Sequence, residues 1–324
     1  MKNILVTAIG SFAGDVVIKN LRKAGCKVIG CDIYNKEWIV DAYNVDQFFQ
    51  APPVSDEKAY LEFITEICKE QDIDYIFPLT DIEVDFYHRN RRLFSSLEIC
   101  PCISCETAIE ICRNKMKLDE FLRNREICQT IPTRMLENVE IKNLDYPVVV
   151  KPFNGRSSQG LHYIDTYEQM QYFVSQNDVT DYIVQPKISG EILTVDVIRN
   201  QNTSTSGCIV RKELLRTMNG AGTSVKVFRN QELEKICINI ANALNINGCV
   251  NFEFIEDENR IYHLIECNPR FSGGVEFSCM SGYDFVINHL KCFEKKEIDL
   301  LSNVQEQFIA RKYEEFITEI VYND

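Results

Sequence analysis

Oxygen-bearing side chains gather at the ends of two neighbouring predicted strands. Glu266 and Asn268 lie two residues apart after an apolar run, so they face the same way on a strand. Asn251 and Glu253 share a face of the preceding predicted strand in the same manner. If the short turn at 256–259 joins the two strands as an antiparallel pair, these groups converge into the oxygen set that Mg²⁺ prefers. The alternative is two strands with solvated acidic ends.

A second group of candidate functional residues lies in the loop 153–160 (FNGRSSQG), which follows Lys151 and Pro152. Small residues let backbone N–H groups approach a phosphate closely, and the two hydroxyls add hydrogen-bond donors. The loop lacks the G-K-[ST] ending of a Walker loop. Taken alone, it is compatible with phosphate binding or with a plain turn.

The elements that must position these groups begin with a predicted parallel α/β domain. A strand at 4–8, the glycine-bearing loop 9–14, a helix and a strand ending at Asp32 predict a βαβ unit. Its glycine loop is compatible with nucleotide binding or with a simple glycine turn. An amphipathic helix at 57–71, a strand at 75–77 and a helical segment near 84–95 extend this domain to about residue 105.

The pattern changes from Ser104 onward. Two short helices, the second at 115–123, precede a proline-bounded strand at 147–152. Later predicted elements follow one another through short turns, which favours antiparallel pairing: strands around 191–198 and 206–213, a helix at 231–245, and strands at 249–255 and 261–267. The fold class predicted is therefore α/β followed by α+β.

Taken in order, the motifs resemble the ATP-grasp superfamily, especially its carbamoyl-phosphate-synthetase-like carboxylate–amine ligases, from residue 1 to about residue 290. After the N-terminal βαβ unit, the matching segments are PLTDIE (78–83), NKMKLDEFL (114–122), YPVVVKP (146–152), GRSSQG (155–160), IVQPKISGE (183–191), VNFEF (250–254) and IECNPRFSGG (265–274).

The resemblance implies three parts. These are a small parallel Rossmann-like (pre-ATP-grasp) domain at 1–105, a two-lobed ATP-grasp domain at 106–295 with a mobile lid at about 120–184, and a short C-terminal segment at 296–324.

The resemblance also implies an ATP site. The implied nucleotide-binding residues are Lys115, Lys151, Arg156, Ser157, Ser158, Gly160, Gln185, Lys187 and Glu191. The two lysines at 115 and 151 would contact phosphates, the loop at 156–160 would fold over them, and the backbone of Gln185 and Lys187 would pair with adenine. The stretch 218–223 resembles the mobile loop that covers the site.

The implied metal ligands are Glu253, Glu266 and Asn268, which would hold one or two Mg²⁺ (or Mn²⁺) ions. Arg270 and Arg211, with Lys151, are the implied catalytic residues that steady the transferring phosphoryl group.

Some positions depart from the family pattern. The acid that often binds ribose hydroxyls is replaced by Ile192, and Glu191 lies one place earlier, where it would face the other way on a strand. The first metal position is Glu253 rather than Gln, and Asn114 stands where the family often has Asp.

Two further groups allow alternative readings. Asp81 and Glu83 follow a parallel strand, where open α/β sheets bind ligands, so they are candidates for a substrate amine; Asp81 could equally cap a helix. Cys100, Cys102, Cys105 and Cys112 are clustered and could bind zinc or simply be buried thiols.

The formal charge of −13, from 35 Lys+Arg and 48 Asp+Glu, argues against nucleic-acid and anionic-membrane partners. No apolar run approaches the ~18 residues of a membrane helix, and the N-terminus does not look like a signal peptide, so a cytoplasmic protein with reduced thiols is expected.

The main hypothesis is a Mg²⁺-dependent ligase that uses ATP to activate a carboxylate as an acyl phosphate for attack by an amine. Its partners would be small-molecule acids and amines, with a homodimer possible. The alternatives are a bicarbonate-activating, carboxyphosphate-forming enzyme and a non-catalytic ATP-binding sensor.

Overall fold

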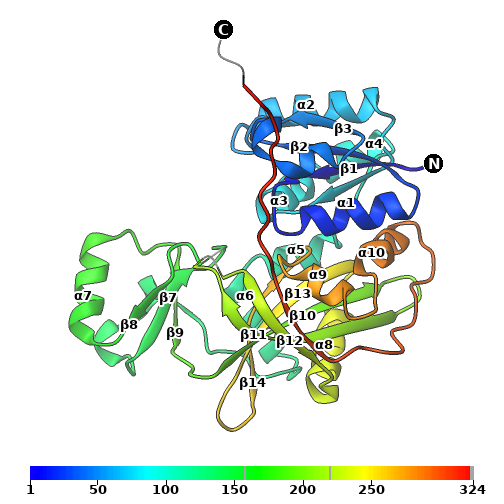
Figure 1. The fold of residues 1–324 in the computed structure, drawn as a ribbon. Helices are drawn as coiled ribbons and strands as arrows, with labels where there is room; N and C mark the ends of the chain where they lie inside the picture. The colour runs from blue at the N-terminus through cyan, green and yellow to red at the C-terminus, as the bar shows by residue number, and fades with distance from the viewer. Residues whose placement is uncertain (157, 219, 322–324) are drawn as a thin grey trace.

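The computed structural model describes residues 1–156, 158–218 and 220–321. Its N-terminal part is a parallel sheet with the strand order β3-β2-β1-β4-β5, flanked by helices (Figure 1). The strands are β1 (Asn3–Thr7), β2 (Lys27–Asp32), β3 (Gln47–Gln50), β4 (Tyr75–Pro78) and β5 (Cys100–Pro101). The main helices are α1 (Gly14–Lys23), α2 (Glu57–Glu70), α3 (Asp81–Arg89) and α4 (Arg91–Ser96). The predicted parallel α/β domain is confirmed.

The helical segment expected near 84–95 begins earlier and is divided at Asn90. Thr80 is the N-cap of α3 and forms a capping box with Glu83, so Asp81 is the first residue of the helix and not its cap. Glu83 is buried and also accepts a hydrogen bond from the Tyr60 hydroxyl at 3.1 Å. Burial raises the pKa of Glu83, and its bonds assign it to the helix start rather than to a substrate amine.

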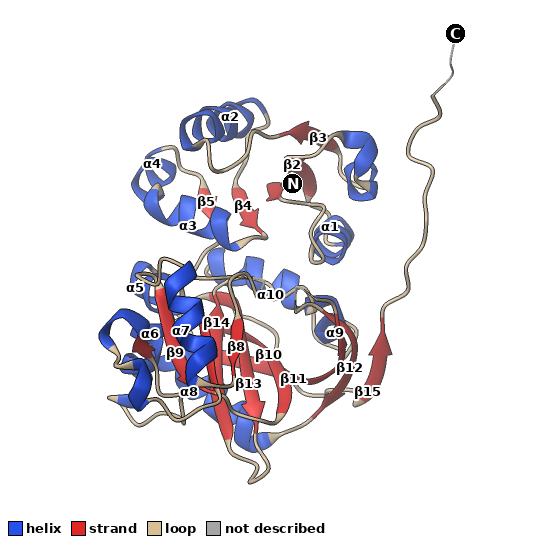
Figure 2. Cartoon of the chain, turned by 90° about the vertical axis from the view of Figure 1, so that its left-hand side faces the viewer, coloured by secondary structure: helices blue, strands red, loops and turns tan. Residues whose placement is uncertain are grey.

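The second part holds two antiparallel sheets, which confirms the α+β prediction (Figure 2). The smaller sheet has the order β6-β9-β7-β8 and comprises β6 (Arg134–Met135), β7 (Val148–Pro152), β8 (His162–Ile164) and β9 (Tyr182–Pro186). The larger sheet has the order β14-β13-β10-β11-β12-β15. Its strands are β10 (Glu191–Asn200), β11 (Thr205–Arg216), β12 (Gly222–Phe228), β13 (Gly248–Glu256), β14 (Tyr262–Asn268) and β15 (Gln307–Ala310).

Helices connect and cover these two sheets. They are α5 (Glu106–Cys112), α6 (Lys115–Arg123), α7 (Tyr167–Gln176), α8 (Gln231–Ala243), α9 (Val275–Cys279) and α10 (Phe285–Phe293). After β15, the chain runs extended beside the N-terminal domain (red in Figure 1), where the Thr318 hydroxyl donates to the Glu37 carbonyl at 2.6 Å. Within the described residues, no helix combines the length and the apolar character needed to cross a bilayer.

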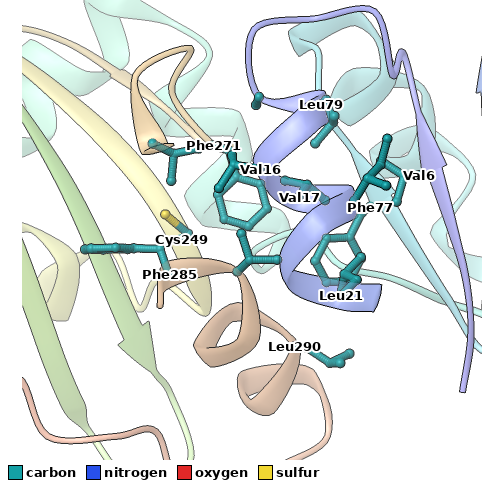
Figure 3. Close-up of a cluster of buried hydrophobic side chains, with 14 of the residues drawn as sticks. Val6, Val16, Val17, Leu21, Phe77, Leu79, Cys249, Phe271, Phe285 and Leu290 are labelled. Carbon is teal, nitrogen blue, oxygen red and sulfur yellow. The ribbon is translucent and has the colours of Figure 1, made fainter. Parts of the chain in front are cut away.

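A continuous apolar core joins the N-terminal domain to the larger sheet (Figure 3). Val17 and Leu21 of α1 and Phe77 of β4 pack in one buried cluster with Phe271 and Leu290 from the second part of the chain. Each of these side chains is at most 3% exposed. Because burial of apolar surface is the main favourable term in folding, this cluster fixes the edge of the parallel sheet against the antiparallel one.

His289 lies inside this junction and is held in one neutral form. Its Nδ1 accepts from the Cys249 N–H at 2.8 Å, so Nε2 carries the proton and faces the Cys102 carbonyl at 3.1 Å. Burial lowers the pKa of His289 from 6.5 to about 3. Between about pH 6.5 and pH 3, His289 is therefore protonated in the unfolded chain and neutral in the folded protein.

We expect His289 to make the protein acid-sensitive. Because its folded-state pKa is depressed, its contribution to the free energy of unfolding is complete above pH 6.5 and falls by up to about 1.4 kcal/mol per pH unit as the pH drops toward 3. Urea unfolding between pH 7.5 and 4.5 measures this slope. His289→Gln should flatten it, whereas replacement of the exposed His162 by Gln should not. Equal slopes in wild type and His289→Gln would contradict the assignment.

Candidate functional site

One cavity of about 940 Å³ collects most of the residues that the sequence singled out. Its walls come from the small sheet, from the larger sheet, and from the carboxyl edge of the parallel sheet at residues 11–13 and 79–82. Open α/β sheets bind ligands at this edge, where the connections leave β1 and β4 in opposite directions.

Two carboxylates face each other on one wall of the cavity. Glu253 of β13 and Glu266 of β14 are direct partners in the antiparallel register, and a register shift follows Glu253. Asn268 Nδ2 donates to Glu266 Oε1 at 3.1 Å, as the shared strand face predicted. The expected pairing of these strands is therefore confirmed.

The charges around the two acids differ. Burial and the nearby Glu266 charge raise the pKa of Glu253, although Arg216 bonds its Oε2 at 3.0 Å. Burial also acts to raise the pKa of Glu266, but Lys115 and Lys151 outweigh that effect and hold the pKa below its usual range. Two adjacent half-buried carboxylates, one of them with a raised pKa, form a site that a divalent cation would neutralise, and the amide oxygen of Asn268 adds a third ligand of the right kind.

Two lysines lie beside this acid pair. Asn114 caps α6 through its side chain, which accepts from the Lys117 N–H, and this places Lys115 at the first position of the helix. Lys115 Nζ lies 2.9 Å from the Gly155 carbonyl and 3.2 Å from Glu266 Oε2. Lys151 is the last residue but one of β7; burial, together with the charge of Lys115, lowers its pKa to about 8.

The glycine- and serine-rich loop borders the same cavity. Arg156 and Ser158 line it, whereas Ser157 lies outside the described residues. Gly160 does not line the cavity but shapes the loop: its φ is +69°, and a Cβ there would lie 3.0 Å from both Pro152 and the Tyr182 hydroxyl. Gly160 therefore has a conformational role in this loop.

Gln185 and Lys187 lie where β9 leaves the small sheet, and both line the cavity. The Gln185 side chain is turned to the Thr133 hydroxyl at 2.7 Å. The Lys187 N–H donates to the Pro147 carbonyl at 3.1 Å, so this N–H is already engaged. The backbone of Gln185 and Lys187 was predicted to pair with adenine. For the Lys187 N–H to do so, its bond to Pro147 would have to break.

Arg270 is tied to the N-terminal domain. Its Nη2 donates to Asp81 Oδ2 at 2.6 Å, and the other carboxylate oxygen lies 3.4 Å from Arg113 Nη1. Arg113 is also paired with Asp85, with bonds of 2.9 and 3.0 Å. Asp81, one of the two acids considered for a substrate amine, therefore positions Arg270 at the cavity wall.

Arg211 is the most deeply enclosed predicted residue, with 1% of its surface exposed. Its guanidinium contacts Asp196 and Ser278, and Nη2 donates to the Ser272 hydroxyl at 3.2 Å. Arg211 nevertheless lines the cavity, so its charge acts on the site. Because the guanidinium is shielded from water, that charge is screened less than it would be at the surface.

Comparison with known proteins agrees with this geometry. The family model described as "ATP-grasp in the biosynthetic pathway with Ter operon" matches residues 178–316, and the model "PylC-like, N-terminal domain" matches residues 4–103. The carbamoyl phosphate synthase large chain of Clostridium beijerinckii is 28% identical over 196 residues, which are 55% of this chain and 18% of that protein. The first match identifies residues 178–316 as an ATP-grasp segment.

Solved structures share the overall fold of this chain at low sequence identity. Biotin carboxylase from Campylobacter jejuni superposes with a TM-score of 0.77 at 17% identity, covering 94% of this chain and 73% of that one. N5-carboxyaminoimidazole synthetase from Staphylococcus aureus gives 0.75 at 17% identity, covering 92% and 78%. L-amino acid ligase from Bacillus licheniformis gives 0.70 at 19% identity, covering 90% and 73%. The chain spans less than a fifth of the length of the carbamoyl phosphate synthase chains that it matches.

Glu191 does not line the cavity, which corrects its predicted place in the nucleotide site. It is the first residue of β10, more than half exposed, and its carboxylate pairs with Lys212 Nζ at 2.5 Å outside the cavity. Ile192 lines the cavity instead. The physical reason is the alternation of side chains along β10.

Sequence reasoning missed a third acid in the cavity. Glu213 accepts from the Thr194 hydroxyl at 2.5 Å, and its Oε2 is buried without a hydrogen-bond partner among the described residues. Arg216, the partner of Glu253, was also missed. Glu213 stands two residues after Arg211 on a predicted strand, and this shared face is the signal that could have identified it.

None of the four clustered cysteines lines this cavity. Cys102 and Cys112 are buried, and Cys100 and Cys105 are partly exposed. Among the described residues, no group of three or more His, Cys, Asp or Glu side chains is placed to hold a metal ion. The zinc alternative therefore has no support.

Proposed function

We propose that the protein is an ATP-dependent ligase that converts a carboxylate into an acyl phosphate for attack by an amine, releasing ADP and phosphate. The observation that carries the proposal is the grouping of Glu253, Glu266, Lys115, Lys151 and Arg270 around one cavity. The family models and the fold of the L-amino acid ligase support it. The acid pair, with its lysines, argues against the non-catalytic sensor, and the bicarbonate-activating alternative is not favoured.

ATP is the proposed cosubstrate, held between the small and the larger sheet. Its phosphates would lie against Lys115 and Lys151, where two point charges meet the polyphosphate, with Arg156 and Ser158 beside them. Gln185 and Ile192 would line the base and sugar end. The chain as a whole has a formal charge of −13, yet it would concentrate positive charge at this one place, where a small polyanion binds.

Glu253, Glu266 and Asn268 are the proposed ligands for Mg²⁺, and the oxygen donor set described above fits a hard cation. When bound, such an ion neutralises phosphate charge during phosphoryl transfer. The protein's own groups add Arg270 and Arg211, whose fixed guanidinium charges stabilise an anionic acyl phosphate. Asp81 holds Arg270 in position through the 2.6 Å bond.

The acid and the amine would bind where the cavity reaches the N-terminal domain, near Ser11, Phe12 and Thr80. The role of the protein there is to hold the two reactants in line, because displacement at the acyl phosphate requires no nucleophilic side chain. The cytoplasmic location and a homodimer stay predictions.

The proposal is tested by following phosphate release from Mg·ATP with a matrix of amino acids and other small carboxylates, each paired with amines. Release that requires both an acid and an amine supports the ligase. Bicarbonate alone serves as the comparison for the carboxyphosphate alternative. If a correctly folded protein bound ATP tightly but released no phosphate with any acid and amine pair, the proposal would be refuted.

We expect ATP affinity to fall at alkaline pH because of Lys151. The phosphates favour its protonated form, and its pKa in the free protein is about 8. Affinity should therefore be constant below pH 8 and decline by up to about tenfold per pH unit above it, until the higher pKa of the complex is passed. Titration calorimetry from pH 6.5 to 9.5 measures this. Lys151→Arg, which stays charged, should give a flat profile; an unchanged decline in that variant would contradict the assignment.

A further inference from the structure

A second cavity, of about 490 Å³, lies where the N-terminal domain meets the larger sheet. It shares no lining residue with the first cavity. One side is formed by α4 and the segment 98–105, the other by the turn after β10 and the end of α10. Its volume falls in the range of small-molecule sites.

Cys100 opens into this cavity, and Cys102 lies behind it. Cys100 is partly exposed, whereas Cys102 is 3% exposed and separated from it by Pro101 alone. The Cys102 thiol donates to the Cys100 carbonyl at 3.7 Å. Of these two cysteines, only Cys100 lines the cavity.

Two cations and one acid line the same cavity. Arg91 is held in place by the Ser104 carbonyl and by His88 Nδ1 at 3.2 Å, and Lys295 is exposed at the other side. Glu98, exposed at the edge, is the acid. The charge of this lining favours an anionic occupant.

The environment of Cys100 differs from that of Cys128 and Cys279, two other partly exposed thiols. The neighbouring Cys102 thiol, followed by the charges of Arg91 and Lys295, lowers the pKa of Cys100 despite its burial. Burial instead raises the pKa of Cys128 and Cys279 to about 12. Because the thiolate is the nucleophilic form, Cys100 is expected to react faster than Cys128 and Cys279.

We propose that Cys100 is a thiol–disulfide exchange site, modified by an anionic low-molecular-weight disulfide that Arg91 and Lys295 hold in the second cavity. The Cys100 thiolate attacks one sulfur of R–S–S–R, a Cys100–S–S–R bond forms, and the original S–S bond breaks. The Cys100 sulfur is oxidised, and the departing sulfur is reduced, leaves as R–S⁻ and takes up a proton. A free thiol R–SH reverses the reaction.

The test uses the full chain, without ATP, and two disulfides of opposite charge. Oxidised glutathione is the anionic probe and cystamine the cationic one; the reaction is quenched with alkylating agent and read by intact mass and peptide mapping. We expect one adduct, on Cys100, forming about tenfold faster with oxidised glutathione after each rate is normalised to an unstructured cysteine peptide.

Variants locate the effect. Cys100→Ser should remove the adduct, and Cys128→Ser, the matched control, should leave it unchanged. Lys295→Asn should reduce the anionic preference; asparagine tolerates the left-handed backbone at φ +58° there. An adduct spread evenly over Cys26, Cys105, Cys128 and Cys279, or cystamine reacting as fast as oxidised glutathione, would overturn the proposal.

Discussion

Replacing Glu266 with Gln is expected to lower ADP formation by about 10²–10³-fold while the protein remains folded. Glutamine keeps the shape of the side chain and can still accept the bond from Asn268. It removes the negative charge that stands opposite Glu253 and 3.2 Å from Lys115. The proposed metal ligands then carry one charge fewer, at the point where the phosphoryl group is transferred.

The same substitution should affect nucleotide binding differently. In the free protein, Lys115 and Lys151 are partly neutralised by Glu266. Without that carboxylate their charge is available to phosphate, so Glu266→Gln should bind ATP at least as tightly as wild type when no divalent ion is present. Calorimetry with and without Mg²⁺, beside coupled ADP assays, separates loss of binding from loss of turnover.

A matched control is available on the partner strand. Glu256 lies on β13 as Glu253 does, but it faces Tyr262 and Glu191 and does not line the cavity. Glu256→Gln should retain full turnover. If Glu266→Gln kept more than about a tenth of the wild-type rate, the proposed role of Glu266 in phosphoryl transfer would be refuted.

Much of this wall of the site follows from local rules that a sequence expresses directly. The spacing of Glu266 and Asn268 places them on one strand face, and the short turn at 256–259 makes β13 and β14 neighbours. The parallel N-terminal sheet follows in the same way from alternating strand and helix patterns. Each of these inferences needs only residues that are close in the chain.

What could not be predicted depends on contacts between distant segments. The bond from Arg270 to Asp81 joins residues 189 positions apart, and it exists because an apolar core fixes the two domains together. Glu191 was placed in the site and Glu213 was missed because only the assembled sheet determines which face of β10 and β11 meets the cavity. Thr80 rather than Asp81 caps α3 because Thr80 forms the reciprocal capping-box hydrogen bonds with Glu83.

Arg211 and Asp196 are expected to have the largest effect on stability. They are 1% and 0% exposed, and the Asp196 carboxylate also accepts from the Ser278 hydroxyl at 2.7 Å and from Asn251 Nδ2 at 3.1 Å. Removing one charge leaves the other buried without compensation. Asp196→Asn or Arg211→Gln alone should therefore each lower the free energy of unfolding by about 3–5 kcal/mol.

The double variant separates stability from chemistry. In Asp196→Asn/Arg211→Gln both buried charges are gone and polar groups remain to bond Ser278 and Asn251, so urea unfolding should recover most of the loss seen in either single variant. Turnover should stay low, because the Arg211 guanidinium no longer faces the cavity. The exposed Glu191–Lys212 pair on the same two strands is the control: Glu191→Gln should change stability by less than about 1 kcal/mol and leave turnover intact. A stable, fully active double variant would show that Arg211 contributes to folding alone.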